Sequence, residues 1–162
     1  MTGLLALFVP RRAAHSGRMP HEQRSLRALC PSESVDLLSR AQVGRVVFTE
    51  RALPAVVPVT FAVHGESVVL RTAADTRLAT AADGGVLAFE ADELDPVTRT
   101  GWSVVVTGVA ELVTDPAERD RIHRAVTPWA PGDQDVCIRL PLTVVTGRRI
   151  ASSSRAPSTS AV

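Results

Sequence analysis

Residues 54–72 read PAVVPVTFAVHGESVVLRT, and this stretch decides the fold. Two Val-rich runs, 54–63 and 67–72, stand on either side of the short polar segment His64-Gly65-Glu66. Valine and threonine favour extended backbone, and a glycine between two such runs favours a tight turn. The stretch therefore predicts two consecutive β-strands joined by a turn.

Further strand-like runs lie before and after this stretch. They are RVVFTE at 45–50, VLAFEA at 86–91, WSVVVTGVAELV at 102–113 and VCIRLPLTVVTG at 136–147. Short β-type runs separated by Gly, Pro and Asp are typical of a β-barrel or a β-sandwich. The sequence thus predicts at least six strands.

Three short helices interrupt the strands. One is expected to start at Pro31-Ser32 with Ser32 as its cap, and the others are expected over 75–82 and 115–126. The Asp115-Pro116 pair suits a helix start, because an acceptor side chain caps the helix and proline fits its first turn. So few helices argue against a doubly wound parallel sheet, and the predicted fold class is mainly β (α+β).

The two ends of the chain differ in composition from its middle. Residues 1–25 mix Arg, His, Pro and Gly without periodicity, and residues 152–162 read SSSRAPSTSAV. Such segments carry too little apolar surface to build a core. We expect one domain over 26–150, a disordered leader over 1–25 and a disordered tail over 151–162, and we leave open whether Met1 or Met19 starts translation.

The composition excludes several chemistries. All 18 basic residues of the 162-residue chain are Arg, and Lys, Tyr and Asn are absent. A chain without Lys forms no Schiff base and no Walker-type phosphate loop, and a chain without Tyr has no phenolic acid or base. His64 and His123 stand apart from any nucleophile or metal-ligand pattern, so no catalytic side chain and no metal site is predicted.

Charge and cysteine content constrain the partners. The net charge is +1 with interspersed signs, and the two cysteines, Cys30 and Cys137, are far apart in the chain. Neither nucleic acid nor a disulfide framework is expected from this pattern. The apolar run at 54–63 is too short for a membrane helix, and no export signal is recognisable, so we expect a cytoplasmic protein without membrane contact.

The segment LRTAADTRL at 70–78 is a candidate anion site. It places Arg71 and Thr72 at a strand end and Thr76 and Arg77 at a helix start. Two guanidinium groups and two hydroxyls could converge there, since Arg binds phosphate oxygens in a fork. The same pattern also fits a capped helix with solvated arginines, and the residues alone leave both interpretations open.

Two more positions stand out on the strands. Pro58 interrupts an otherwise buried strand, which marks a strand edge or the approach of something other than a strand, such as a planar ligand. Trp102 and Ser103 open a long strand with their side chains on opposite faces. Trp102 fits either a core residue or the wall of a ligand site.

Taken together and in order, five segments resemble one known family. They are SESVDLLSRAQVGRVVF, PAVVPVTFAV, VVLRTAADTRLATA, VLAFEADELDPVTRTGWSVVVTGVAELV and PWAPGDQDVCIRLPLTVVTGRRI. Over about residues 26–150 they are similar to the pyridoxamine 5′-phosphate oxidase-like FMN-binding split barrels, in particular small actinobacterial members. The resemblance implies a six-stranded antiparallel split β-barrel that forms a homodimer.

The resemblance also implies a cofactor site. The family binds FMN or a related deazaflavin in grooves at the dimer interface, and its cofactor-binding positions fall on Val57, Pro58, Val59, Thr60, Arg71, Thr72, Thr76, Arg77, Trp102 and Ser103. Arg77 stands where the family usually has Lys, and Ser103 stands where true oxidases often have Gln. Trp129 and Arg148 match positions near the cofactor or the partner subunit.

The function implied is that of a flavin-dependent oxidoreductase that transfers hydride to or from a small organic substrate. A carrier or sensor that binds flavin without turnover is the alternative. The segment with which pyridoxamine phosphate oxidases hold the substrate phosphate is not recognisable, so that particular activity is not expected.

Overall fold

The computed structural model describes residues 24–152, which form nine strands and three helices. The strands are β1 (Arg24–Leu29), β2 (Val43–Glu50), β3 (Leu53–His64), β4 (Ser67–Thr72), β5 (Val86–Asp95), β6 (Thr100–Val109), β7 (Glu111–Leu112), β8 (Val136–Pro141) and β9 (Val144–Ser152). The helices are α1 (Pro31–Leu38), α2 (Arg77–Ala81) and α3 (Pro116–Ala125). The expected leader and tail fall mostly outside the described residues.

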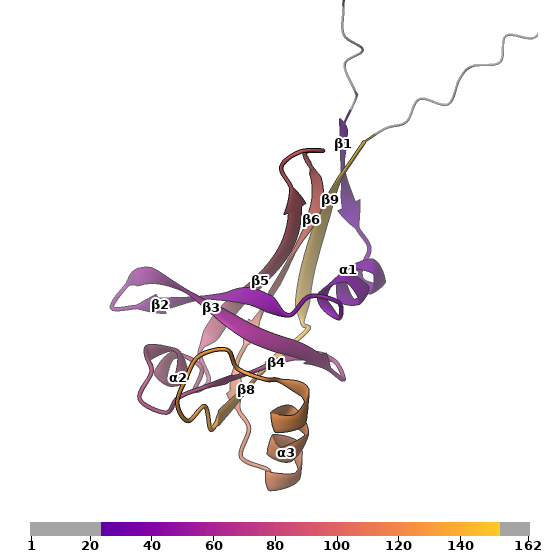
Figure 1. Cartoon of the computed structure of the whole chain (residues 1–162). Coiled ribbons are helices and arrows are strands. Elements are labelled where there is room, and N and C mark those ends of the chain that lie inside the picture. Colours follow the sequence, from indigo (N-terminus) through magenta and orange to yellow (C-terminus); the bar gives the residue numbers. More distant parts are fainter. Residues whose placement is uncertain (1–23, 153–162) are drawn as a thin grey trace, which may run out of the picture.

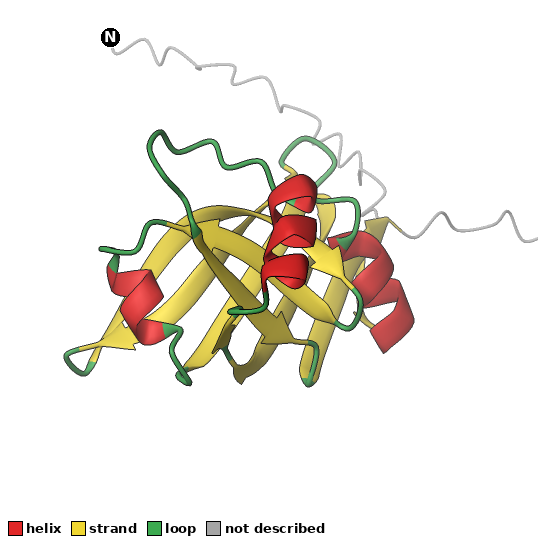
Figure 2. Ribbon diagram, turned by 90° about the horizontal axis from the view of Figure 1, so that it is seen from below, coloured by secondary structure: helices red, strands yellow, loops and turns green. Residues whose placement is uncertain are grey.

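The strands form one antiparallel sheet in the order β1-β9-β6-β5-β2-β3-β4-β8-β7. In Figure 1, β1, β9, β6 and β5 run alongside one another with α1 beside them, while α2 and α3 lie near β4 and β8. Figure 2 shows the strong curvature of the sheet and the helices outside it. This is the split-barrel fold, and the predicted class, mainly β with a few short helices, is confirmed.

The strand count differs from the six expected because two long runs are broken and one strand was missed. The run at 102–113 breaks at Ala110, whose N–H donates to Gly85, and the run at 136–147 breaks at Leu142, whose N–H donates to Glu66. Strand β1 has the sequence RSLRAL, without β-branched residues, and it exists through its pairing with β9. β1 and β9 also extend the domain slightly beyond 26–150.

Helix starts also differ in detail. The N-cap of α1 is Cys30 rather than Ser32, and the Glu33 carboxylate accepts a hydrogen bond from the Cys30 N–H at 3.1 Å. Helix α2 begins at Arg77, two residues later than Asp75, because Thr76 caps it by accepting from the Ala79 N–H at 3.1 Å. Asp115 caps α3 and Pro116 follows it, as predicted.

The core lies inside the curved sheet. Alternate residues of β5 and β6 point inward, among them Phe89, Val104 and Val106, which are fully buried. Phe89 packs on Phe61 with ring centroids 4.6 Å apart. A smaller cluster outside β4 and β8 joins them to α3 through Val69, Val113, Ile122, Val126 and Cys137. These two clusters pack against both sides of the strands that carry the candidate site.

Candidate functional site

Strand β3 has an unpaired edge along two thirds of its length. Its residues 53–60 all pair with β2, but β4 pairs only with Phe61–His64 of β3. In an antiparallel strand the backbone groups of alternate residues point to opposite sides. The segment around Pro58 therefore presents backbone N–H and C=O groups that no described strand uses.

A pocket of about 460 Å³, which we call the β3 pocket, lies along this edge. Its walls come from the second half of the unpaired segment, from the start of β2, from the β4–α2 connection and from the loop between α3 and β8. The lining residues are Val43, Val57, Pro58, Val59, Thr60, Arg71, Thr72, Thr76, Leu78, Pro128, Trp129, Ala130 and Gln134. Seven of the ten predicted cofactor residues thus lie in one pocket, together with Trp129.

Arg71 is held at the end of this pocket by the loop opposite. Its Nε donates to the carbonyl of Gln134 at 2.9 Å, and one Nη donates to the carbonyl of Val126 at 3.2 Å. A guanidinium has five N–H donors, so these two bonds leave three for another acceptor. Both partners are neutral, and the positive charge of Arg71 is therefore available to an anion in the pocket.

The two threonines beside Arg71 bond to each other. The hydroxyls of Thr72 and Thr76 lie 3.0 Å apart, and Thr76 also donates to the carbonyl of Ala73 at 2.8 Å. Thr76 in addition caps α2, so its hydroxyl serves the local backbone. Thr72 is buried and supports Thr76, and both side chains line the β3 pocket.

Arg77 does not converge on this pocket, contrary to the expected grouping of two guanidinium groups. Its side chain is 71% exposed, and its guanidinium donates to the Glu50 carboxylate at 2.7 Å. The reason is that Glu50 ends β2 close to the start of α2 and offers the nearest acceptor of opposite charge. The structure thus brings one arginine, not two, into the β3 pocket.

Trp102 and Ser103 also lie away from the β3 pocket within one chain. Trp102 faces inward, is 7% exposed, and donates from its indole N–H to the Glu93 carboxylate at 3.3 Å. Ser103 faces the other side of β6, opposite Asp92 on β5 and Arg148 on β9. Neither residue is among those that line the β3 pocket.

Sequence reasoning missed several walls of the β3 pocket. Val43, Leu78, Pro128, Ala130 and Gln134 line it, and Gln134 also positions Arg71 through its carbonyl. A backbone carbonyl carries no side-chain signal, and no local pattern indicates that the 128–134 loop closes over β4. The Pro and Gly content of that loop was the one available indication of an irregular segment near the site.

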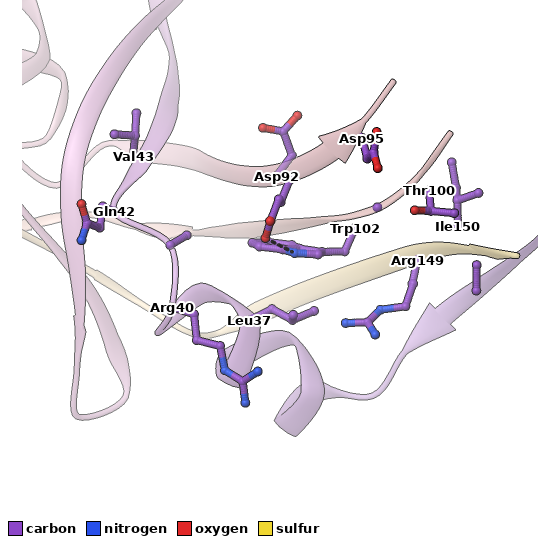
Figure 3. Close-up of a pocket in the computed structure, with 14 residues that line it drawn as sticks. Leu37, Arg40, Gln42, Val43, Asp92, Asp95, Thr100, Trp102, Arg149 and Ile150 are labelled. Carbon is purple, nitrogen blue, oxygen red and sulfur yellow. Dashed lines mark hydrogen bonds between the residues drawn. The ribbon is translucent and has the colours of Figure 1, made fainter. Parts of the chain in front are cut away.

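A second, larger pocket lies on the other side of Val43, which lines both. This β9 pocket has a volume of about 890 Å³ and is shown in Figure 3. It is enclosed by the end of α1, the start of β2, the β5–β6 hairpin and the end of β9. Its lining residues are Leu37, Arg40, Ala41, Gln42, Val43, Asp92, Glu93, Asp95, Thr100, Gly101, Trp102, Arg149, Ile150 and Ala151.

The outer face of β5, β6, β9 and β1 is uncovered by any described part of the chain. Cross-strand pairing places Ser103 and Arg148 near its middle, and large apolar residues surround them. The exposed apolar residues on this face are Leu26, Val86, Leu94, Val109, Val144 and Ile150. An apolar sheet face of this kind is typical of a surface that another protein covers.

Titratable groups are few around the β3 pocket, whose lining contains no Asp, Glu, His or Cys. Burial raises the pKa of the Cys137 thiol, which lies opposite Arg71 on β8, and the nearby positive charge of Arg119 opposes that shift. Among residues 24–152, no three His, Cys, Asp or Glu side chains gather as metal ligands would, and no helix is both long and apolar enough to cross a membrane.

The fold is a split β-barrel with a pocket beside the unpaired edge of β3. Residues 31–149 match the family model described as pyridoxamine 5′-phosphate oxidase, and the chain belongs to this pyridoxamine 5′-phosphate oxidase-like family. The resemblance inferred from the sequence is thereby confirmed.

Individual proteins are also similar to this chain. The chain is 43% identical over 143 residues to the uncharacterized protein Rv0080 of Mycobacterium tuberculosis, a match that covers 85% of this chain and 94% of that one. The structure of the present chain is similar to that of an FAD binding protein from Mycobacterium smegmatis, with 34% identity and a TM-score of 0.62, and the match covers 77% of this chain and 98% of that one. A conserved protein of unknown function from Corynebacterium diphtheriae gives 28% identity, a TM-score of 0.65 and coverage of 78% and 98%.

Proposed function

We propose that this chain binds a flavin in the β3 pocket. The observation that carries the proposal is the unpaired edge of β3, which faces a pocket that ends at a charged, incompletely bonded Arg71. A flavin mononucleotide has a planar ring with a polar edge and a phosphate some distance away. The pocket offers a matching pair of features, backbone donors and acceptors beside Pro58 and a guanidinium at its end.

Each part of the pocket has a separate role in this proposal. The backbone groups of Pro58 and Thr60 point away from β2 and hydrogen-bond to the ring edge, and the missing N–H of Pro58 leaves room for the flat ring to approach. Val57 and Val59 line the pocket beside them. Arg71 neutralises phosphate charge, with Thr72 and Thr76 beside it. Trp129, which is 73% exposed, covers the open side.

The proposed contact with Arg71 is common to three kinds of flavin. FMN, FAD and a phosphorylated deazaflavin all carry a phosphate on the ribityl chain, which Arg71 would contact in each case. The similar protein from M. smegmatis is described as FAD binding, so FAD joins FMN and deazaflavin as a candidate here.

A bound flavin supplies hydride or electron transfer at its own ring. The β3 pocket needs no acid or base for that chemistry, and its lining contains none. The residues would orient the ring, hold its phosphate and limit the access of water. We propose an oxidoreductase acting on a small organic substrate, and the same pocket without turnover would serve a flavin carrier or sensor.

We further propose that the working unit is a homodimer formed through the uncovered face of β5, β6, β9 and β1. The apolar residues on that face support this, since a monomer would leave them in water. Ser103 and Arg148 lie on this face and not in the β3 pocket of their own chain. They can therefore contribute to a flavin site only from across a dimer interface.

The visible absorption spectrum of the purified full chain tests flavin binding. The expected result is the two-band spectrum of an oxidised flavin or the single band of a deazaflavin, and chromatography of the heat-released cofactor distinguishes FMN, FAD and deazaflavin. A colourless protein that binds none of these when they are added would contradict the proposal.

Variants test the pocket assignment. Arg71→Gln is expected to weaken FMN binding by about tenfold or more, because it removes a charge-assisted contact, while the affinity for riboflavin changes little. Arg121→Gln, on the exposed face of α3, is the matched control and should leave both affinities unchanged. If Arg71→Gln retains full FMN affinity while remaining folded by circular dichroism, the phosphate does not lie at Arg71.

Turnover is tested separately on the reduced cofactor. After reduction of the bound flavin, NAD(P)⁺ or a quinone should accept electrons faster in the presence of the protein than in buffer with free flavin. Equal rates would favour the carrier or sensor.

A further inference from the structure

The β9 pocket contains a buried hydrogen-bond donor without an acceptor. The Nε of Arg149 is buried and has no hydrogen-bond partner among the described residues. Arg149 lies on β9 between Arg27 of β1 and Trp102 of β6. An unsatisfied buried donor on a charged group destabilises a folded protein, so such a group points to a missing acceptor.

The carboxylates around Arg149 are already engaged. Glu33 is bound by Arg27 through two hydrogen bonds of 2.8 and 3.1 Å. Asp92, which lines the β9 pocket, is paired with Arg45 at 3.0 Å. Glu93, also in the lining, accepts a hydrogen bond from the indole N–H of Trp102. The pairing partners of Arg149 are thus a second cation and a tryptophan, and neither supplies a negative charge.

Asp95, the remaining carboxylate of the lining, is used by its own turn. It accepts from the N–H groups of Val97 and Thr98 and from the Thr98 hydroxyl, at 2.8, 3.3 and 2.7 Å. These bonds lower the pKa of Asp95 and keep it charged but occupied. None of these carboxylates accepts a hydrogen bond from the Nε of Arg149.

The surroundings of Arg149 combine charge with apolar surface. In Figure 3 the guanidinium extends from β9 below the Trp102 ring and turns toward Leu37. Leu37 and Trp102 are nearly buried, and the side chain of Arg40 forms no hydrogen bond or ion pair within residues 24–152. The pocket thus offers two cations without a carboxylate partner among residues 24–152, next to an apolar wall, while the carboxylates of its lining are bonded to other groups.

We propose that the β9 pocket is a binding site for a small organic anion, with Arg149 as the residue that binds its carboxylate or phosphate. The compact apolar part of the ligand packs against Leu37 and Trp102. The pocket volume of about 890 Å³ lies within the range of pockets that bind small organic molecules. The site is separate from the β3 pocket, so the proposal does not depend on flavin binding.

The positions of the two tryptophans allow a direct test. The chain has two Trp residues, Trp102 in the β9 pocket and Trp129 in the β3 pocket. A Trp129→Phe variant reports through Trp102 alone, and a Trp102→Phe variant reports through Trp129 alone. Fluorescence titrations with phenyl phosphate and with benzoate then locate binding and distinguish the two anionic groups, with benzyl alcohol as the uncharged probe.

The expected result is a saturable change in Trp102 emission with at least one of the two anions. Benzyl alcohol should cause no such change. Adding Arg149→Gln should raise the apparent dissociation constant by about tenfold or more. Adding Arg121→Gln instead should leave it unchanged. Benzoate-selective or phosphate-selective binding would each support the site and assign its ligand group.

Three results would overturn the proposal. They are no anion-dependent change in Trp102 emission, an equal response in the Arg149→Gln variant, and a response of Trp129 with none of Trp102. Size-exclusion chromatography with light scattering adds a fourth: if Arg149→Gln dissociates a dimer and no anion binds, the missing acceptor belongs to a partner chain. Flavin content, read from the visible spectrum, tests the β3 pocket separately from the three fluorescence results.

Discussion

Arg77 donates a hydrogen bond to Glu50 at 2.7 Å, across 27 positions of sequence, and this ion pair holds Arg77 outside the β3 pocket. Glu50 is the last residue of β2, and Arg77 is the first of α2. The side chain of Arg77 is mostly exposed and that of Glu50 is partly buried. An exposed cation thus lies next to the candidate phosphate site while it forms an ion pair with a protein carboxylate.

This relationship predicts that Glu50 competes with phosphate for Arg77. Glu50→Gln removes the charge that holds the guanidinium, so FMN affinity should rise by a few-fold while riboflavin affinity stays the same. Isothermal titration of both ligands measures the difference. Without ligand, a double-mutant cycle of Glu50 and Arg77 should give a coupling free energy below about 1 kcal/mol, because the pair is exposed. A lower FMN affinity in Glu50→Gln would show that Arg77 needs Glu50 to be correctly placed.

A charge on the uncovered sheet face should dissociate the proposed homodimer. Val144 is 54% exposed on β9, opposite Thr107 of β6. Val144→Asp would bury a carboxylate in the interface, and light scattering should then give the mass of one chain. Flavin occupancy should fall in parallel if the site needs both chains. Val97→Asp, in the β5–β6 turn and 87% exposed, is the control that should leave the mass of the assembly unchanged.

The start of α1 should make folding sensitive to acid. The Arg27 guanidinium and the Cys30 N–H lower the pKa of the Glu33 carboxyl from its usual 4.5 to about 2. Because the folded state holds the charged form, the stabilisation is present above pH 4.5 and is lost as the pH falls toward 2.

Glu33→Gln should therefore flatten the dependence of the unfolding free energy on pH within that interval. Urea unfolding at several pH values measures the effect. Asp36→Asn, on the exposed side of the same helix, is the control expected to keep the slope of the natural chain. Equal slopes for Glu33→Gln and the natural chain would rule out this carboxylate as the source.

The centre of the barrel should tolerate little loss of volume. Phe89 is fully buried, packs on Phe61, and its ring lies against Gly44 so closely that a Cβ there would overlap it. Phe89→Ala should lower the free energy of unfolding by about 3–5 kcal/mol, as large core truncations do. Val97→Ala at the exposed turn should change it by less than about 0.5 kcal/mol. Urea denaturation of both variants, in the presence and absence of flavin, separates core stability from ligand stabilisation.

Much of the fold could be predicted from the sequence because its signals are local. Runs of valine and threonine indicate extended backbone from residue to residue, and Asp115-Pro116 indicates a helix start from two neighbours. The seven predicted residues of the β3 pocket come from two short segments, 57–60 and 71–76, which adjacent strands β3 and β4 bring together. A hairpin connection needs no knowledge of distant parts of the chain.

Other features depend on contacts between distant residues. Strand β1 has little β-propensity and is ordered by its hydrogen bonds to β9, and Arg71 is oriented by carbonyls of the 126–134 segment. Arg77 is predicted to line the site because it stands at the start of the helix that follows the Arg71 strand. Whether its guanidinium binds a phosphate or Glu50 depends on where β2 ends in space. A propensity cannot contain that information, because it describes one residue and its neighbours.

The sequence alone determined the alternation that makes Trp102 and Ser103 face opposite sides of β6, since side chains of a strand alternate by geometry. The tertiary structure decided what each side chain meets. Inward, Trp102 lies between Glu93 and Arg149 at the β9 pocket, and outward, Ser103 lies on a face that no described part of the chain covers. The reason is that sheet order and register result from the packing of the whole domain, so the neighbours of a strand residue are set by strands far away in the chain.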